Sequence, residues 1–248
     1  MAASFLSILP FHLLYSGVDQ NKELIQQDLS KSTIFFPVVR LIIGAVLVSL
    51  YKLLQLTLLA PDLIDGMILT VWIGLSGGLH LEGLADMVDG FAGGKNKEDI
   101  IRIMKDGAVG AKGAIVLIIL ILLKFLILRS LPASIKMESL MVIPVIGRWA
   151  MVPSGYWGKP ASSNNTLTNY FTLYLGKKEL CVSTLIALGI TFYFLSYQTI
   201  YLFVFAGILT RLMIAYSYSR IQGICGDVIG AVNELTEGVV LLFFIMLK

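Results

Sequence analysis

Long, uninterrupted apolar runs constrain the fold of this chain more than any other feature. Hydrophobic residues make up 57% of the 248 positions and charged residues 14%, whereas soluble domains carry about 25% charged residues. A helix rises about 1.5 Å per residue, so seven of the runs can cross a hydrocarbon core of about 30 Å, provided that the shorter ones stand upright or the bilayer thins around them. Continuous runs favour helices over the alternating strands of membrane barrels. The predicted spans are about 34–59, 63–79, 113–131, 138–155, 180–196, 198–218 and 228–247.

These spans predict an all-α integral membrane protein, a bundle of about seven transmembrane helices forming one polytopic domain over 1–248. Residues 1–31 are mixed in character, and we expect them to form an interfacial arm on the membrane surface. The segment 80–112 is the longest connection and is expected to be a cytoplasmic, catalytic loop. Two cysteines and two histidines are too few for a disulfide framework or a three-histidine zinc site.

Basic residues are distributed unevenly between the two sides that seven spans define. Eleven lie on the side of the N-terminal arm and three on the other, counted outside the spans. Basic residues in short loops stay in the cytoplasm, so the N-terminus and the 80–112 loop are expected there, in a cell (inner) membrane. The eleven are Lys22, Lys31, Lys95, Lys97, Arg102, Lys105, Lys112, Lys159, Lys177, Lys178 and Arg220, and the three are Arg129, Lys136 and Lys248.

The first chemically distinctive motif is G-G-L-H-L-E-G-L-A-D-M-V-D-G-F-A-G-G at 77–94. Its acidic residues Glu82, Asp86 and Asp89 are spaced i, i+4 and i+7, which places them on one face of a helix. Like charges at this spacing repel, and Mg²⁺ typically binds a few carboxylates together with substrate phosphates. We therefore predict a metal site at these three residues, with His80 beside it as a substrate-binding residue. The alternative is a solvated acidic face.

A second polar stripe lies in the last span, where Asp227, Glu234 and Glu237 recur at i, i+7 and i+10 with Asn233 adjacent. Charged groups inside a membrane helix usually face the bundle interior or a water-filled cavity. We expect this span to pack beside 80–94, so that Asp227 and Asp86 border one cavity. The deeper Glu234 and Glu237 are expected to pair with one of two intramembrane arginines, whose guanidinium forks also suit phosphate. These arginines are Arg148 and Arg211.

Two carboxylate stripes with arginines nearby indicate metal-assisted phosphoryl chemistry at a membrane-embedded, cytoplasm-facing site. A divalent-cation transporter, which also uses carboxylates, remains an alternative from a different class of protein. It has less use for the arginines or for a glycine-rich surface segment.

Several motifs resemble those of the cobalamin synthase (adenosylcobinamide-GDP ribazoletransferase) family. They are the 77–91 motif, I-M-K-D-G-A-V-G-A-K-G at 103–113, G-I-C-G-D-V-I-G-A-V-N-E-L-T-E at 223–237, F-L-S-I-L-P at 5–10 and S-T-I-F-F-P at 32–37. The lone Arg148 in an apolar span is also similar, and the order of the motifs agrees over nearly the whole chain. A CDP-alcohol phosphotransferase is the nearest alternative in chemistry, but its pattern has Ala-Arg after the Asp-Gly, where this chain has Phe91 and Ala92.

The resemblance implies a membrane-bound transferase of vitamin B12 biosynthesis. It would join adenosylcobinamide-GDP to α-ribazole or its 5′-phosphate and release GMP, with Mg²⁺ as cofactor. Asp86, Asp89 and Asp227 would be catalytic, with Asp89 a candidate general base, and Lys105 and Asp106 would contact substrate. The lipid bilayer is an expected partner and nucleic acid is not, and a homo-oligomer remains open.

Three positions depart from the family's usual pattern. Glu82 stands where the family usually has Asp, which preserves a carboxylate with one more methylene. Ala108 replaces an arginine, leaving Lys105 and Lys112 as the nearby cations. Cys225 replaces a threonine.

Overall fold

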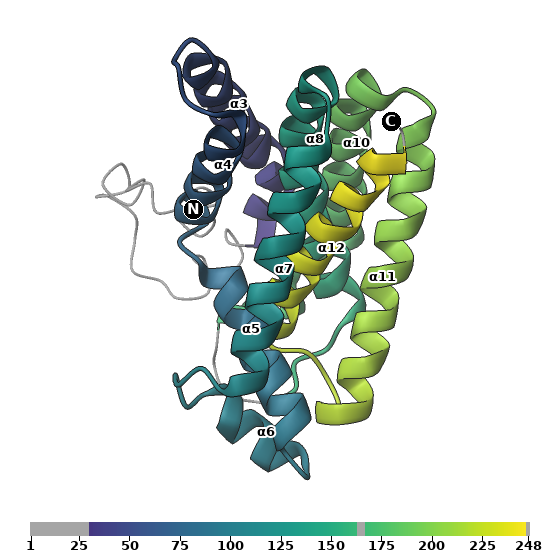
Figure 1. Ribbon diagram of the computed structural model, residues 1–248. Helices are drawn as coiled ribbons and strands as arrows, with labels where there is room; N and C mark the ends of the chain where they lie inside the picture. Colours follow the sequence, from purple (N-terminus) through teal and green to yellow (C-terminus); the bar gives the residue numbers. More distant parts are fainter. Residues whose placement is uncertain (1–29, 163–166, 247–248) are drawn as a thin grey trace, which may run out of the picture.

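The computed structural model describes residues 30–162 and 167–246, and this part of the chain is a helical bundle (Figure 1). The predicted all-α class is confirmed, because the described residues form no sheet and only one isolated bridge, between Pro160 and Ile224. The predicted arm lies outside the described residues apart from Ser30 and Lys31. The elements are η2 (Thr33–Phe35), α3 (Phe36–Gln55), α4 (Pro61–Ser76), α5 (Leu79–Gly93), α6 (Lys97–Met104), α7 (Ala111–Ser130), α8 (Ala133–Trp157), α9 (Leu167–Tyr174), α10 (Lys177–Leu195), α11 (Gln198–Ile221) and α12 (Gly226–Met246).

The protein is a multi-pass membrane protein, although the expected count of about seven spans is not confirmed. Five described helices are long and apolar enough to cross a membrane: Ser30–Gln55, which contains α3, and α7, α10, α11 and α12. A sixth crossing results if α4 and α5, bent by 82° at their junction, count as one span. The helix α8 is not among these spans. Every residue from Val142 to Gly155 is buried in the protein, so this helix can carry a charge such as Arg148 without facing lipid.

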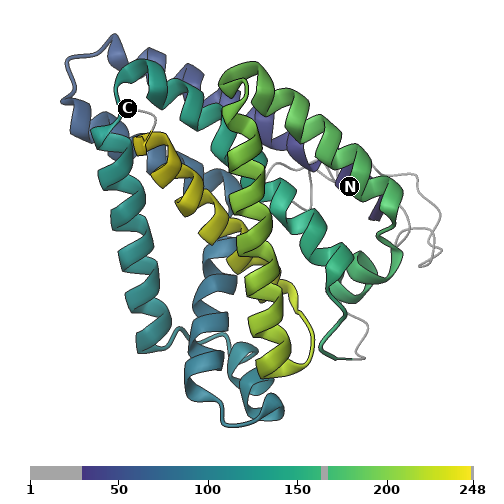
Figure 2. The same ribbon diagram turned by 90° about the vertical axis from the view of Figure 1, so that its right-hand side faces the viewer.

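The helix α12 runs through the interior of the bundle, as the yellow ribbon in Figures 1 and 2 shows. In the most apolar stretch of α12, 67% of the stretch is buried inside the protein, whereas the corresponding share is 22–39% in the other four spans. The neighbours of α12 are α5, α7, α8 and α11. A helix enclosed in this way has no large lipid-facing side, so its acidic residues must be compensated by the helices around it.

The junction between α4 and α5 turns the chain sharply. Gly77 and Gly78 both have φ of +67°, in the left-handed region that side chains with a Cβ disfavour. The turn directs α5 back along α12 (Figure 2). At the crossing, a Cβ on Gly83 would lie 2.9 Å from the Asp227 Cα, so only glycine permits this approach. The prediction that the last span packs beside 80–94 is confirmed.

A buried ion pair joins α8 to α4. The Lys136 Nζ donates hydrogen bonds to both carboxylate oxygens of Asp65, at 2.6 and 2.7 Å. The same ammonium lies 5.4 Å from the ring centroid of Tyr51 on α3, a cation–π distance. Both charged side chains are almost fully buried. The Lys136 ammonium therefore connects α8, α4 and α3. Removing one partner of the ion pair would leave the other charge buried at a large desolvation cost.

We expect Lys136→Met to destabilise the protein by about 3–5 kcal/mol, because it leaves the Asp65 carboxylate buried without a counter-charge. The measurement is the thermal unfolding midpoint of the detergent-purified protein. The double variant Lys136→Met/Asp65→Leu should recover most of the loss, since no charge is then stranded. A double variant as unstable as the sum of the two single variants would show that the pair is not coupled.

Candidate active site

Polar side chains gather at two levels along the contact between α5 and α12. The outer level, here called the acidic mouth, consists of Glu82, Asp86 and Asp227. The inner level, here called the buried charge network, extends over the next one to three helical turns of α12. It consists of Arg40, His80, Lys124, Asn233, Glu234 and Glu237.

The acidic mouth forms where the first turn of α12 crosses α5 at Gly83. Asp86 and Asp227 are half-buried and Glu82 is exposed. Both Asp86 and Glu82 act on Asp227 as nearby negative charges, and Lys105 acts on it as a nearby positive charge. The structure therefore brings together Asp86 and Asp227, which are 141 positions apart in the sequence. Within residues 30–162 and 167–246, no group of three or more His, Cys, Asp and Glu is arranged as a metal-binding set.

Asp89 occupies a different position from its neighbours on α5. Its Oδ2 accepts a hydrogen bond from the Gly110 backbone N–H at 2.8 Å, and its Oδ1 accepts one from the Gly113 N–H at 2.9 Å. Gly110 is the N-cap residue of α7, so Asp89 satisfies two amide groups that the start of a helix leaves without partners. A carboxylate at this end of a helix also interacts favourably with the helix dipole. Both Asp89 oxygens are thus already engaged in holding α7 to α5.

Basic residues bind the C-terminal end of α5. The Arg220 Nη2 donates to the carbonyl oxygens of Phe91 and Gly94, at 2.5 and 3.2 Å. The Lys112 Nζ donates to the Ala92 carbonyl at 2.9 Å. These groups lie at the C-terminal end of α5, where cations are favoured by the helix dipole. Lys105 and Lys112 are the two lysines near Ala108, where the family usually has arginine. Lys112 is already engaged in the contact with α5.

Lys105 and the neighbouring Asp106 are exposed at the end of α6. Lys105 also lies close enough to Asp227 for their charges to interact. Unlike Lys112, it is therefore a cation available beside the acidic mouth.

Cys225, immediately before α12, contacts the acidic mouth. Its Sγ donates to the Asp227 Oδ2 at 3.6 Å, so the cysteine supplies a hydrogen-bond donor where the family usually has the hydroxyl of threonine. Burial, reinforced by the charge of Asp227, raises the pKa of the Cys225 thiol to about 12. A raised pKa favours the neutral thiol, which can donate its S–H to Asp227.

The buried charge network corrects the expected pairing of the deeper acids. Glu234 and Glu237 pair with Lys124 of α7, whose Nζ lies 2.7 Å from an oxygen of each. The Asn233 side-chain amide donates to the same two carboxylates at 3.2 Å. Neither Arg148 nor Arg211 makes these pairs, because another span supplies a closer cation.

The two predicted arginines make other contacts. Arg211 is exposed on α11, with its guanidinium carbon 5.3 Å from the Trp157 ring centroid, so it is not part of this network. Arg148 is fully buried on α8, and its Nη1 donates to the Met151 Sδ at 3.1 Å.

Arg40 is a member of the network that the sequence reasoning did not single out. It is 0% exposed on α3, and none of its three guanidinium nitrogens has a hydrogen-bond partner among the described residues. Glu237 and Glu234 act on it as nearby negative charges. The signal that could have identified Arg40 and Lys124 is their occurrence as basic residues inside apolar spans, the same criterion that selected Arg148.

His80 reaches the network from the beginning of α5. It is 4% exposed, and its Nε2 has no hydrogen-bond partner within the described chain. Its Nδ1 would lie 3.4 Å from a Cβ on Gly230 of α12, so it packs directly against that helix. His80 therefore belongs to the inner level, at a position about one turn beyond Asp227 along α12.

Comparisons with known proteins match the chain over nearly its whole length. A family profile described as cobalamin-5-phosphate synthase matches residues 1–245. An adenosylcobinamide-GDP ribazoletransferase of Clostridium botulinum (strain Okra / Type B1) is 34% identical over 231 residues, covering 93% of this chain and 92% of the relative. Proteins with the same name from Alkaliphilus metalliredigens (strain QYMF) and Thermoanaerobacter sp. (strain X514) are 32% and 30% identical, covering 98% and 99% of this chain and 95% of each relative.

No solved structure gives a significant match to this chain. The family match extends over both acidic segments and over nearly all the helices that position them. The chain therefore belongs to the cobalamin-5-phosphate synthase family.

Proposed function

We propose that this protein is an adenosylcobinamide-GDP ribazoletransferase. It joins adenosylcobinamide-GDP to α-ribazole or α-ribazole 5′-phosphate, yielding adenosylcobalamin or its 5′-phosphate and GMP. The support is the family match over residues 1–245 and the shared name of relatives that are 30–34% identical over almost their whole length. The same match disfavours a CDP-alcohol phosphotransferase and a divalent-cation transporter.

The observation that carries the chemistry is the convergence of Asp86 and Asp227 across the contact of α5 with α12. In the reaction, a ribose hydroxyl oxygen bonds to the phosphorus that carries cobinamide, and the bond from that phosphorus to the GMP oxygen breaks. The hydroxyl proton must pass to a base. Asp86 and Asp227 have oxygens available for this role, whereas both Asp89 oxygens accept backbone hydrogen bonds. Asp89 is thus better suited to positioning the start of α7.

The donor chemistry of the acidic mouth fits Mg²⁺. This ion prefers oxygen ligands and is commonly held by one or two protein carboxylates together with substrate phosphates. Asp86 and Asp227 supply two carboxylates that repel each other, and Glu82 supplies a third at the exposed edge. When bound, Mg²⁺ would neutralise charge on the pyrophosphate and favour departure of GMP.

The remaining polar residues fall into two proposed roles. Lys105 and Asp106 are exposed beside the mouth and would contact the nucleotide or phosphate part of a substrate. Glu234 and Glu237 bind Lys124 and accept from Asn233, and these three α12 residues would support the acidic mouth from below. This assignment places substrate contacts at the outer level and structural charge pairing at the inner level.

We further propose that the acidic mouth faces the cytoplasm of a cell (inner) membrane. The mouth lies at the end of the bundle that includes α6 and the start of α7, and most of the loop basic residues belong to that side. Cytoplasmic loops carry an excess of lysine and arginine. A cytoplasmic mouth is also accessible to nucleotide-bearing substrates.

Asp86→Asn and Asp227→Asn should each lower turnover of adenosylcobinamide-GDP to GMP by about 100-fold or more, the usual range for loss of acid–base catalysis. The assay is GMP release by the purified protein, with thermal unfolding as a check on folding. Glu98→Gln, an exposed carboxylate on α6, is the matched control and should remain active. Wild-type turnover in either aspartate variant would refute its role.

Turnover should cease in excess EDTA and return on addition of Mg²⁺ or Mn²⁺, because the acids of the mouth repel without a counter-cation. GMP release is again the readout. Full activity in the chelator would contradict a metal-assisted reaction.

The proposed orientation predicts where an added cysteine can be labelled in sealed cells. In a Cys181→Ser/Cys225→Thr background, a membrane-impermeant maleimide should label Lys248→Cys from outside and should not label Lys95→Cys until the cells are opened. Labelling of position 95 in intact cells would reverse the orientation.

A further inference from the structure

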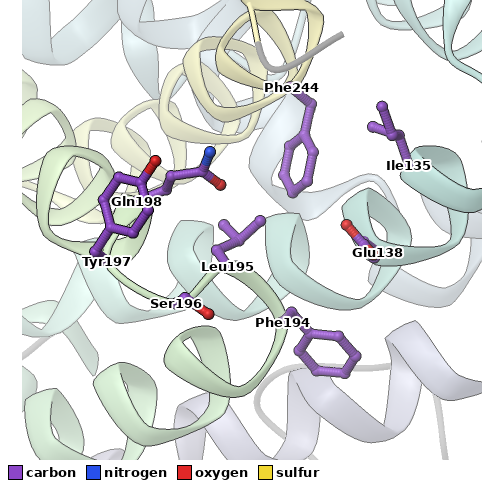
Figure 3. Close-up of a pocket in the computed structure, with 8 residues that line it drawn as sticks. All are labelled: Ile135, Glu138, Phe194, Leu195, Ser196, Tyr197, Gln198 and Phe244. Atoms are coloured by element: carbon purple, nitrogen blue, oxygen red, sulfur yellow. The ribbon is translucent and has the colours of Figure 1, made fainter.

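A pocket of about 300 Å³ lies at the end of the bundle remote from the acidic mouth (Figure 3). It is formed by the start of α8, the turn between α10 and α11, and the end of α12. Chain direction places it there, because Asp227 is in the first turn of α12 and Phe244, which lines the pocket, is in the last. The pocket is therefore separate from the site assigned to the transfer reaction.

Among the described residues that line the pocket, Glu138 is the only one with a side chain that is charged at neutral pH. Among the described residues Glu138 makes no hydrogen bond or ion pair through its side chain. The nearby Lys136 cannot neutralise it, because its ammonium is bound to both oxygens of Asp65. A half-buried carboxylate without a partner favours a cation in the space that it faces.

The rest of the lining suits an ammonium group attached to an apolar body. Figure 3 shows Glu138, the Gln198 amide and the Phe244 ring arranged around the same space. The Gln198 amide and the Ser196 hydroxyl offer oxygen acceptors for N–H donors. The faces of aromatic rings also attract cations. The described residues of the lining thus offer a negative charge, neutral acceptors and a ring, and none of them carries a cationic side chain.

Exposed tyrosines indicate the level of the pocket in the membrane. Tyr193, Tyr197 and Tyr201 are 83%, 66% and 56% exposed around the α10–α11 turn. Tyrosines concentrate where the hydrocarbon core meets the headgroup layer, because the ring is apolar and the hydroxyl is polar. An exposed ion pair joins Arg129 in the last turn of α7 to Asp62 in the first turn of α4, and it lies at the same end of the bundle as the pocket. Lipid headgroups are the ligands available at this depth.

We propose that this pocket binds the headgroup of an aminophospholipid, with Glu138 as the counter-ion of its primary ammonium. A primary ammonium has N–H groups that can donate to the Glu138 carboxylate and to a neutral oxygen acceptor of the lining, such as the Gln198 amide. A choline headgroup has no N–H to donate, and a glycerol headgroup has no positive charge. The pocket therefore selects phosphatidylethanolamine over phosphatidylcholine and phosphatidylglycerol, and the lipid joins the ends of α8, α11 and α12.

The test is native mass spectrometry of the full-length protein in detergent, titrated separately with these three lipids. The wild type should retain phosphatidylethanolamine in preference to the other two. Glu138→Gln should weaken its binding by about tenfold, the effect expected for loss of a charge-assisted hydrogen bond. Glu98→Gln, at the other end of the bundle, is the matched control and should bind as the wild type does.

A charge reversal keeps the proposal open to refutation if Glu138→Gln alters folding. Glu138→Lys should bind phosphatidylglycerol in preference to phosphatidylethanolamine, because the headgroup phosphate then meets a cation. Equal retention of the three lipids by the wild type, or unchanged phosphatidylethanolamine binding in folded Glu138→Gln, would overturn the proposal.

Discussion

The structure depends on the compensation of acidic charge inside the membrane bundle. Lys124 of α7 binds both Glu234 and Glu237 of α12 at 2.7 Å, and removing one partner of such a buried pair is strongly destabilising. The contact fixes how α12 is rotated about its axis. Asp227 lies seven residues, or about two turns, before Glu234, so the same rotation turns Asp227 toward α5. A charge interaction deep in the bundle thereby orients the residue proposed to act at its mouth.

Helix packing also contributes to the position of α5 against α12. The left-handed conformations of Gly77 and Gly78 return α5 to the bundle, and Gly83 lets its backbone approach Asp227. At the other end of the motif, Asp89 holds the first turn of α7. The acidic residues of α5 are regularly spaced along the helix, but they serve two different purposes. The middle one, Asp86, faces α12, while the last one secures the helix that carries Lys124.

The sequence predicts the five helices that are long and apolar enough to cross a membrane, the two acidic stripes and the packing of α12 beside α5, because each follows from helical periodicity or from the cost of lipid exposure. The spans predicted at 63–79 and 138–155 are not confirmed as crossings of their own. It does not predict that Lys124 pairs with the deep acids, since several spans carry a basic residue and one-dimensional spacing cannot say which of them face α12. The role of Asp89 as a helix cap is hidden for the same reason. Spacing places it with Glu82 and Asp86, whereas its partners begin 21 residues later.

Asp86 and Asp227 are proposed to form one site, and Mn²⁺ binding followed by electron paramagnetic resonance tests this most directly. In the presence of adenosylcobinamide-GDP, Asp86→Asn and Asp227→Asn should each weaken Mn²⁺ binding by about tenfold or more, because a divalent ion loses one charged ligand in either variant. Glu98→Gln should leave the affinity unchanged. Normal Mn²⁺ affinity in a folded Asp227→Asn variant, with binding lost in Asp86→Asn, would place the two carboxylates in separate sites and contradict the account.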